Sequence, residues 1–184
     1  MNNKVYSEEE LVKRSQRGDE GAFRILVDKY RDMLMGTAYL ILRDRQLTEE
    51  VVQEAVLKMW KHLPSLRDES SLKPWLMRIV VNEANQQFRK KKVATVPLEE
   101  ALEVPDTGNN IDESLIQGEN HRMLKDSLKS LSSEQREVII LRYFSDLTVP
   151  EIAAATSTPE GTVRSRLSRA LDKLYMTISN GDNH

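Results

Sequence analysis

The chain has 184 residues, a formal net charge of −2, 39% hydrophobic residues, 30% charged residues and no cysteine. This length suits one domain or two small ones, and the lack of cysteine excludes disulfide frameworks, thiolate zinc sites and cysteine nucleophiles. The sequence contains no apolar signal peptide, no apolar run of the roughly 20 residues that span a membrane, and no metal-binding spacing. We therefore expect a cytoplasmic protein without cofactor, metal or membrane insertion.

Two helices are predicted at the start of the chain. Ser7 and Glu10 form a capping box ahead of a short helix, and Gly18 is expected to end it. Asp19 is expected to cap a long second helix, because the apolar residues after it recur at three- and four-residue steps.

Two further helices are predicted before residue 93. Thr48 is expected to cap a third helix whose first turn holds Glu49 and Glu50, where the helix dipole favours negative charge. A loop over residues 63–71 leads to a fourth helix over about 72–92. The helical periodicity throughout predicts an all-α fold.

An acidic stretch follows this helical region. Residues 93–120 include seven Asp and Glu residues and no Lys or Arg, together with two prolines and the turn-forming run TGNN. Low hydrophobicity, charge of one sign and turn residues are typical of a linker or disordered segment. We therefore expect two small helical domains, residues 1–92 and 112–184, joined by a flexible acidic linker over residues 93–111.

The second region is also predicted to be helical. A helix with Leu115 and Leu131 is followed by one that Ser132 and Gln135 cap. Two shorter segments then follow, TVPEIAAA from Thr148 and PEGTVRSRLSRALDKL from residue 159 to 174. Two helices joined by a turn of three or four residues, the second of them basic, indicate a helix-turn-helix.

This unit has the chemistry of DNA binding. A helix fits the major groove, where arginine reaches phosphates or hydrogen-bonds to guanine edges. The alternative interpretation is a solvated amphipathic helix with ordinary surface arginines. The candidate DNA-binding residues lie on the second helix: Glu160, Thr162, Arg164, Ser165, Arg166, Arg169 and Lys173.

Four segments, taken in order, resemble the extracytoplasmic-function (ECF) sigma factors of bacterial RNA polymerase. They are GDEGAFRILVDKYRDML, LTEEVVQEAVLKMWKHL, LKPWLMRIVVNEANQQFRKKK and LTVPEIAAATSTPEGTVRSRLSRALDKL. The resemblance implies a promoter-specificity subunit that catalyses no reaction itself. Its expected partners are core RNA polymerase, through the β′ clamp helices and the β flap, together with promoter DNA and an anti-sigma factor.

The resemblance also implies roles for residues of the first region. A polar, largely acidic edge would dock on the β′ clamp helices: Glu49, Glu50, Gln53 and Glu54. The third segment and the loop before it would recognise and open the minus-ten promoter element. The residues assigned to that task are Arg67, Asp68, Trp75, Arg78, Asn82, Asn85, Arg89 and Lys90.

One feature of the resemblance leaves alternatives open, and the chain departs from the family's pattern in two places. The acidic linker either keeps two DNA-reading lobes apart or threads the RNA channel of the polymerase. The turn of the helix-turn-helix has Thr156, Ser157 and Thr158 where the family usually carries leucine, glycine and an apolar residue. Serine in a left-handed conformation costs roughly 1 kcal/mol relative to glycine. Gln86 also replaces a common aspartate.

The sequence therefore predicts an ECF sigma factor, with the minus-thirty-five element read by residues 112–184. The alternative is a stand-alone helix-turn-helix regulator with a helical sensor or interaction lobe. That alternative does not explain the acidic edge or the Asn-bearing basic helix of the first region.

Overall fold

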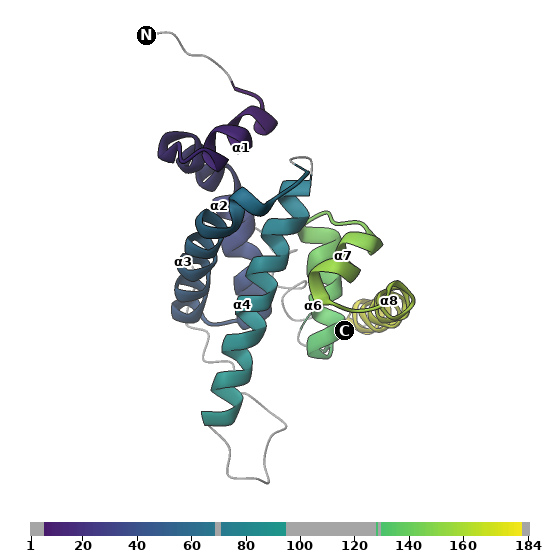
Figure 1. Cartoon of the computed structure of the whole chain (residues 1–184). Helices are drawn as coiled ribbons and strands as arrows, with labels where there is room; N and C mark the ends of the chain where they lie inside the picture. The colour runs from purple at the N-terminus through teal and green to yellow at the C-terminus, as the bar shows by residue number, and fades with distance from the viewer. Residues whose placement is uncertain (1–5, 69–70, 95–127, 129, 182–184) are drawn as a thin grey trace.

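The computed structural model describes residues 6–68, 71–94, 128 and 130–181. Within these ranges, the side chains of residues 91–94 and 178–181 are not described. The described elements are all helical, as expected, and form a first lobe over residues 6–94 and a second lobe over residues 128–181 (Figure 1). The acidic linker lies outside the described residues apart from residues 93 and 94, which end a helix, and so does most of the helix expected around Leu115.

The first two helices begin where the capping residues predict. In α1 (Glu8–Gln16) the Ser7 hydroxyl accepts a hydrogen bond from the Glu10 amide at 3.2 Å. In α2 (Glu20–Leu42) the Asp19 carboxylate accepts one from the Ala22 amide at 3.0 Å. Gly18, between the two helices, has a φ of +88°, a backbone angle that glycine adopts without strain.

The third helix, α3 (Arg45–His62), begins one turn earlier than predicted. Asp44 rather than Thr48 is the cap, and its carboxylate accepts a hydrogen bond from the Leu47 amide at 3.1 Å. The expectation for Thr48 was wrong because aspartate is a stronger cap than threonine. The Thr48 hydroxyl instead donates to the Asp44 carbonyl inside the first turn.

A short 3₁₀ turn, η1 (Leu63–Ser65), lies in the predicted loop, and α4 (Leu72–Ala94) follows that loop. Pro74 is in the first turn of α4, where its missing amide hydrogen costs nothing. Buried residues of α4 pack on α2 and α3, so the first lobe places α4 across both helices.

The second lobe contains the predicted helix-turn-helix. The helix α6 (Ser133–Ile139) starts at a complete capping box between Ser132 and Gln135, and the π-helical turn η3 (Ile140–Phe144) continues it. The leading helix α7 (Val149–Thr156) and the second helix α8 (Glu160–Gly181) then follow. Between these two helices Ser157 has φ 52° and ψ 40°. This is the left-handed conformation expected at a position where ECF sigma factors usually carry glycine.

The two lobes are packed against each other. Figure 1 shows α6 and α7 beside α4, and α7 contacts α4 while η3 contacts α2. One buried cluster includes Leu34 and Met77 from the first lobe together with Leu147 and Ile152 from the second, all with 0% exposure. The described lobes therefore share a core, and the interpretation in which the linker holds them apart does not describe this structure.

Candidate functional site

A pocket of about 430 Å³ lies between α3 and α4 in the first lobe. Three residues that the sequence assigns to the minus-ten element lie in its wall: Trp75, Arg78 and Asn82. The structure brings these three together because they lie one turn apart on the same part of α4. The pocket is completed by Ser65, from the loop assigned to the minus-ten element, and by residues that were not predicted: Lys58, His62, Ile79 and Glu83.

An ion pair joins the two walls of this pocket. Lys58 on α3 donates to the Glu83 carboxylate on α4 at 2.6 Å, and Glu83 is only 9% exposed. The pair fixes the separation of the two helices and places a cation in the wall beside the exposed Arg78. No local sequence signal identifies Lys58, because only the packing of α3 on α4 brings it to Glu83.

The pocket has the groups that an unpaired nucleobase requires. The Asn82 side chain is exposed and offers both a donor and an acceptor to a base edge. The half-buried Trp75 offers a ring on which a base can stack. Arg78 provides positive charge for the nucleic-acid backbone next to that base, whereas the charge of Lys58 is balanced by Glu83.

Other residues assigned to the minus-ten element do not line this pocket. Arg67 and Asp68 are exposed in the loop before α4, where the Ser71 hydroxyl donates to the Asp68 carboxylate at 2.7 Å. Asp68 therefore shapes the start of α4. On the far half of α4, Arg89 donates to the Asn85 carbonyl at 3.2 Å, and both Arg89 and Lys90 are exposed.

Asn85 has a different environment from Asn82. Its amide donates to the Glu137 carboxylate of the second lobe at 2.7 Å, so Asn85 is engaged in the contact between lobes. Glu137 is 9% exposed, and burial raises its pKa despite the hydrogen bond from Asn85.

The second helix of the helix-turn-helix presents an exposed basic surface. Arg164, Arg169 and Lys173 on α8 are exposed, and Arg164 donates to the Glu160 carboxylate at 2.8 Å. The Ser165 hydroxyl donates to the Thr162 carbonyl at 2.9 Å and is thereby directed back to its own helix. The Ser165 hydroxyl is thus engaged with its own helix, while the bond uses only the backbone carbonyl of Thr162.

Arg166 differs from the other arginines of α8 because it is half-buried and lies near acidic residues of α6. The pKa of Glu134 is lowered chiefly by hydrogen bonds from its own amide and Ser132, with a smaller contribution from Arg166. Arg166 also acts to lower the pKa of the buried Glu137, against the effect of burial. This guanidinium therefore favours the ionised form of both carboxylates.

The acidic edge predicted on α3 is exposed as expected. Its four members Glu49, Glu50, Gln53 and Glu54 all face solvent, opposite the buried face of the same helix. Glu49 pairs with Arg45 at 3.2 Å. Leu57, next to this edge and 65% exposed, was missed; its position out of phase with the buried residues is the signal that identifies it.

Trp60, also on α3, belongs to the packing of the lobe. Its ring lies 4.9 Å from that of Phe23 on α2, measured between centroids.

Among the described residues, no helix is long and apolar enough to cross a membrane. The same part of the chain contains no group of three or more His, Asp or Glu side chains that could hold a metal ion.

Both lobes match known protein families. Residues 26–93 match the family described as sigma-70 region 2, and residues 121–174 match the family described as sigma-70 region 4. The two matches occur in this order along the chain and coincide with the two lobes of the structure.

Whole proteins with both regions are also similar. The chain is 31% identical over 176 residues to the RNA polymerase sigma-H factor of Pseudomonas aeruginosa, covering 91% of each chain. It is 32% identical over 184 residues to the ECF RNA polymerase sigma-E factor of Haemophilus influenzae, covering 94% of this chain and 95% of that protein.

Solved structures share the fold. The sigma factor RpoE of Bartonella quintana, in complex with the anti-sigma factor NepR, is 28% identical with a TM-score of 0.66; the match covers 85% of this chain and 96% of that one. CnrH, in complex with the cytosolic domain of CnrY, has a TM-score of 0.69 at 22% identity, with 94% and 97% coverage.

Proposed function

This chain belongs to the ECF class of the sigma-70 family, and from that membership we propose how its two lobes divide promoter recognition. A sigma factor is a non-enzymatic subunit that directs RNA polymerase to specific promoters. The first lobe recognises and opens the minus-ten element, and the second lobe reads the minus-thirty-five element. The match of residues 26–93 to sigma-70 region 2 argues against the alternative of a stand-alone regulator with an unrelated sensor lobe.

The observation that carries the proposal is the pocket between α3 and α4. Opening a duplex unstacks bases at a cost of a few kcal/mol per step, so a protein that opens DNA must capture an unpaired base. The Asn82 amide, the Trp75 ring and the Arg78 guanidinium line one cavity of about 430 Å³. Asn82 reads the base edge, Trp75 stacks on the base, and Arg78 holds the backbone phosphate.

The exposed basic surface of α8 supports the assignment of the second lobe. In a helix-turn-helix the second helix enters the major groove and its N-terminal residues lie nearest the bases. Arg164 is placed there to reach a guanine edge, with its guanidinium oriented by Glu160. Arg169 and Lys173, farther along α8, are placed to contact phosphates.

The acidic edge of α3 supports docking on core polymerase. Glu49, Glu50, Gln53 and Glu54 form a contiguous exposed patch, with Leu57 as an apolar anchor beside it. Such a patch complements the β′ clamp helices that the family binds, and the second lobe contacts the β flap. Complementary charge at this interface speeds association and fixes orientation.

We also propose that an anti-sigma factor regulates this chain. The support is the structural similarity to the Bartonella quintana sigma factor, which was solved with the anti-sigma factor NepR.

The decisive experiment replaces Asn82 with alanine. Asn82→Ala is expected to leave the complex with core polymerase intact and to impair promoter opening, because the lost amide contacts an unpaired base. Permanganate reactivity of thymines near the start site measures the opening. A template mismatched across the minus-ten element should recover part of the lost transcription, since its bases are already unpaired.

Gln86→Ala is the matched control, because Gln86 is an exposed residue one turn farther along α4 and does not line the pocket. This variant should open the promoter as the wild type does. Unchanged thymine reactivity in Asn82→Ala would show that the pocket does not capture a base. Failure of the wild-type chain to co-migrate with core polymerase would contradict the proposed docking.

A further inference from the structure

A side chain of α1 reaches the loop that lines the pocket between α3 and α4. Gln16, the last residue of α1, directs its side-chain amide at two backbone carbonyls before α4. Its Nε2 donates to the Leu63 carbonyl at 3.2 Å and to the Leu66 carbonyl at 2.8 Å. These acceptors lie 47 and 50 positions farther along the chain, so the contact exists only in the folded lobe.

The two carbonyls mark the ends of a turn that supplies part of the pocket wall. η1 begins at Leu63, and the Leu66 amide closes the turn by donating to the Leu63 carbonyl at 3.0 Å. Two lining residues belong to this stretch: His62 directly precedes Leu63, and the Ser65 hydroxyl donates to the His62 carbonyl at 2.6 Å. A shift of the turn therefore moves both lining residues relative to Asn82 on the opposite wall.

Glutamine suits this contact because its side-chain amide has two N–H donors. Both donors are engaged when Nε2 bonds to two carbonyls, and the amide then determines where those carbonyls lie. Glutamate has nearly the same size, but its carboxylate donates nothing when ionised. At position 16 it would place a negative oxygen beside two carbonyl oxygens.

The helix that carries Gln16 is itself tied to the rest of the first lobe. The Tyr30 hydroxyl on α2 donates to the Glu8 carboxylate of α1 at 2.9 Å. Arg14 of α1 pairs with Asp19, the cap of α2, at 2.6 Å. Gln16 therefore connects the loop to a helix whose position is already fixed.

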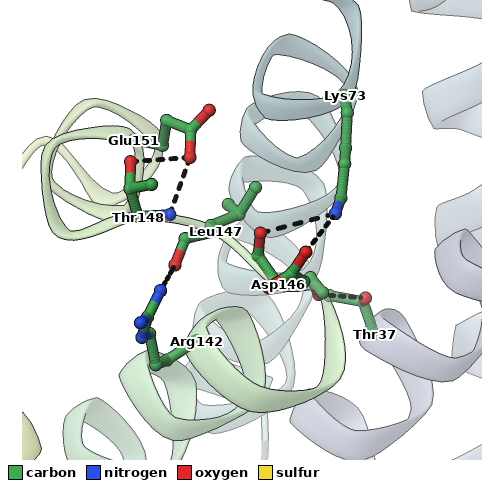
Figure 2. Close-up of polar contacts among 8 residues, drawn as sticks. Thr37, Lys73, Arg142, Asp146, Leu147, Thr148 and Glu151 are labelled. Atoms are coloured by element: carbon green, nitrogen blue, oxygen red, sulfur yellow. Dashed lines mark hydrogen bonds and ion pairs between the residues drawn. The ribbon is translucent and has the colours of Figure 1, made fainter.

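The α4 wall of the pocket is held by separate contacts. The ion pair between Lys58 and Glu83 joins α4 to α3. In the first turn of α4, Lys73 lies 3.4 Å from the Asp146 carbonyl and 3.6 Å from its carboxylate (Figure 2). Loss of the Gln16 contact should thus loosen the loop wall and leave the α4 wall in place.

The helix α2, on which α4 packs, is also held independently of Gln16. The hydroxyls of Thr37 on α2 and Ser145 share a hydrogen bond of 2.9 Å, and both residues are 0% exposed. Next to Thr37, a Cβ added at Gly36 would lie 2.7 Å from Cε1 of Phe144 and closer still to Cζ. No side chain other than hydrogen leaves room for the ring. The loop wall is therefore the part of the pocket that depends on Gln16.

We propose that Gln16 is a positioning residue for base capture. By holding both ends of the η1 turn, it sets where His62 and Ser65 lie in the pocket and so how strictly the pocket selects a base. This inference rests on the proposed function, in which the pocket receives an unpaired base of the minus-ten element. Gln16 precedes residues 26–93, which match sigma-70 region 2, so α1 contributes this contact from outside the matched region.

The first measurement is hydrogen exchange of the free chain, which reports how often the η1 turn opens. Gln16→Met removes both donors and keeps the length of the side chain. The Leu66 amide, which bonds to the Leu63 carbonyl within the turn, should exchange about tenfold faster in this variant, as expected from the loss of one or two hydrogen bonds. Amides in the middle of α4 should exchange as in the wild type.

The second measurement is the base preference of the chain in complex with core polymerase. The probes are single-stranded oligonucleotides in which each position of the minus-ten element carries each of the four bases in turn. The wild type should prefer one base at the captured position. Gln16→Met should reduce that preference about fivefold, the factor that corresponds to one net hydrogen bond between base and protein.

Two further variants separate positioning from stability. Gln16→Glu should reduce the preference at least as much as Gln16→Met, although glutamate is closer to glutamine in shape. A role in packing alone predicts the opposite order. Tyr30→Phe is the control, because it removes the hydrogen bond between α2 and Glu8 of α1 and keeps both bonds from Gln16 to the loop. It should lower Tm without changing the base preference or the exchange of the Leu66 amide.

The outcomes separate this inference from the proposed function. Unchanged exchange at Leu66 in Gln16→Met would overturn the inference, and so would faster exchange with the base preference of the wild type. An equal loss of preference in Tyr30→Phe would show that Gln16 only stabilises α1, which also overturns it. A wild-type complex without base preference at any position would contradict base capture itself, and the inference would fall with the proposed function.

Discussion

Ser157→Gly should stabilise the protein. Ser157 ends α7 with φ 52° and ψ 40° and is exposed, so its side chain contributes little packing to offset the backbone strain. A left-handed conformation costs a residue with a Cβ roughly 1–2 kcal/mol, and glycine loses part of that gain because its unfolded chain is more flexible. The net gain should be about 1 kcal/mol. For a chain of this length that corresponds to a rise in Tm of roughly 2–4 °C.

Thermal unfolding followed by circular dichroism measures this gain, and Gly18→Ser is the inverse control. Gly18 has a φ of +88°, and an added Cβ there would meet no heavy atom within 4 Å, so the substitution changes backbone strain alone. It should lower Tm by an amount similar to the gain at Ser157. A Ser157→Gly protein with an unchanged or lower Tm would refute the strain argument, and so would a Gly18→Ser protein as stable as the wild type.

Three other changes test separate parts of the molecule. Arg164→Ala should weaken binding of the minus-thirty-five element by about 1–3 kcal/mol in mobility-shift titrations if the side chain reads a guanine, with a smaller effect on unrelated DNA. Arg169→Ala should weaken binding to all sequences alike and should reduce the salt slope by about one unit, which titrations at several salt concentrations will show. Glu137→Gln should raise Tm at pH 7, because it keeps an acceptor for Asn85 and removes a carboxylate whose pKa is raised by burial. Above the ordinary glutamate pKa, Glu137 keeps its proton in the folded protein but loses it in the unfolded chain. The free energy of unfolding of the wild type therefore falls as pH rises through this range. The advantage of the glutamine should therefore shrink as pH is lowered toward that ordinary value, and an advantage independent of pH would contradict this explanation.

Local signals predicted the local structure well. Caps at Ser7, Asp19 and Ser132 lie where the sequence places them, because a capping side chain bonds to amides only two or three residues away. The error at Thr48 came from choosing the weaker of two nearby caps. It moved the helix start but left the exposed face of α3 correct.

Features that depend on distant segments were not predicted. The pocket between α3 and α4 was predicted in part, since Trp75, Arg78 and Asn82 share one helix. Lys58 and His62 were missed, because only the packing of α3 on α4 brings them to the same cavity. Asn82 and Asn85 lie only three residues apart in the sequence. No local signal indicates that Asn85 hydrogen-bonds to Glu137, which lies 52 positions farther along the chain.

The fit of Phe144 over Gly36 has a consequence for proteins assembled from parts. In the division of promoter recognition proposed above, the two lobes carry separate tasks, and a hybrid of this first lobe with the second lobe of a relative should keep both. The hybrid inherits the fit between lobes only if the relative supplies a ring of matching size. A smaller residue leaves a void over Gly36, and a first lobe with any residue larger than glycine at that position excludes the ring. Hybrids that read the same promoter should thus differ in how tightly their two lobes pack, so promoter choice and the stability of the contact between lobes can be inherited independently.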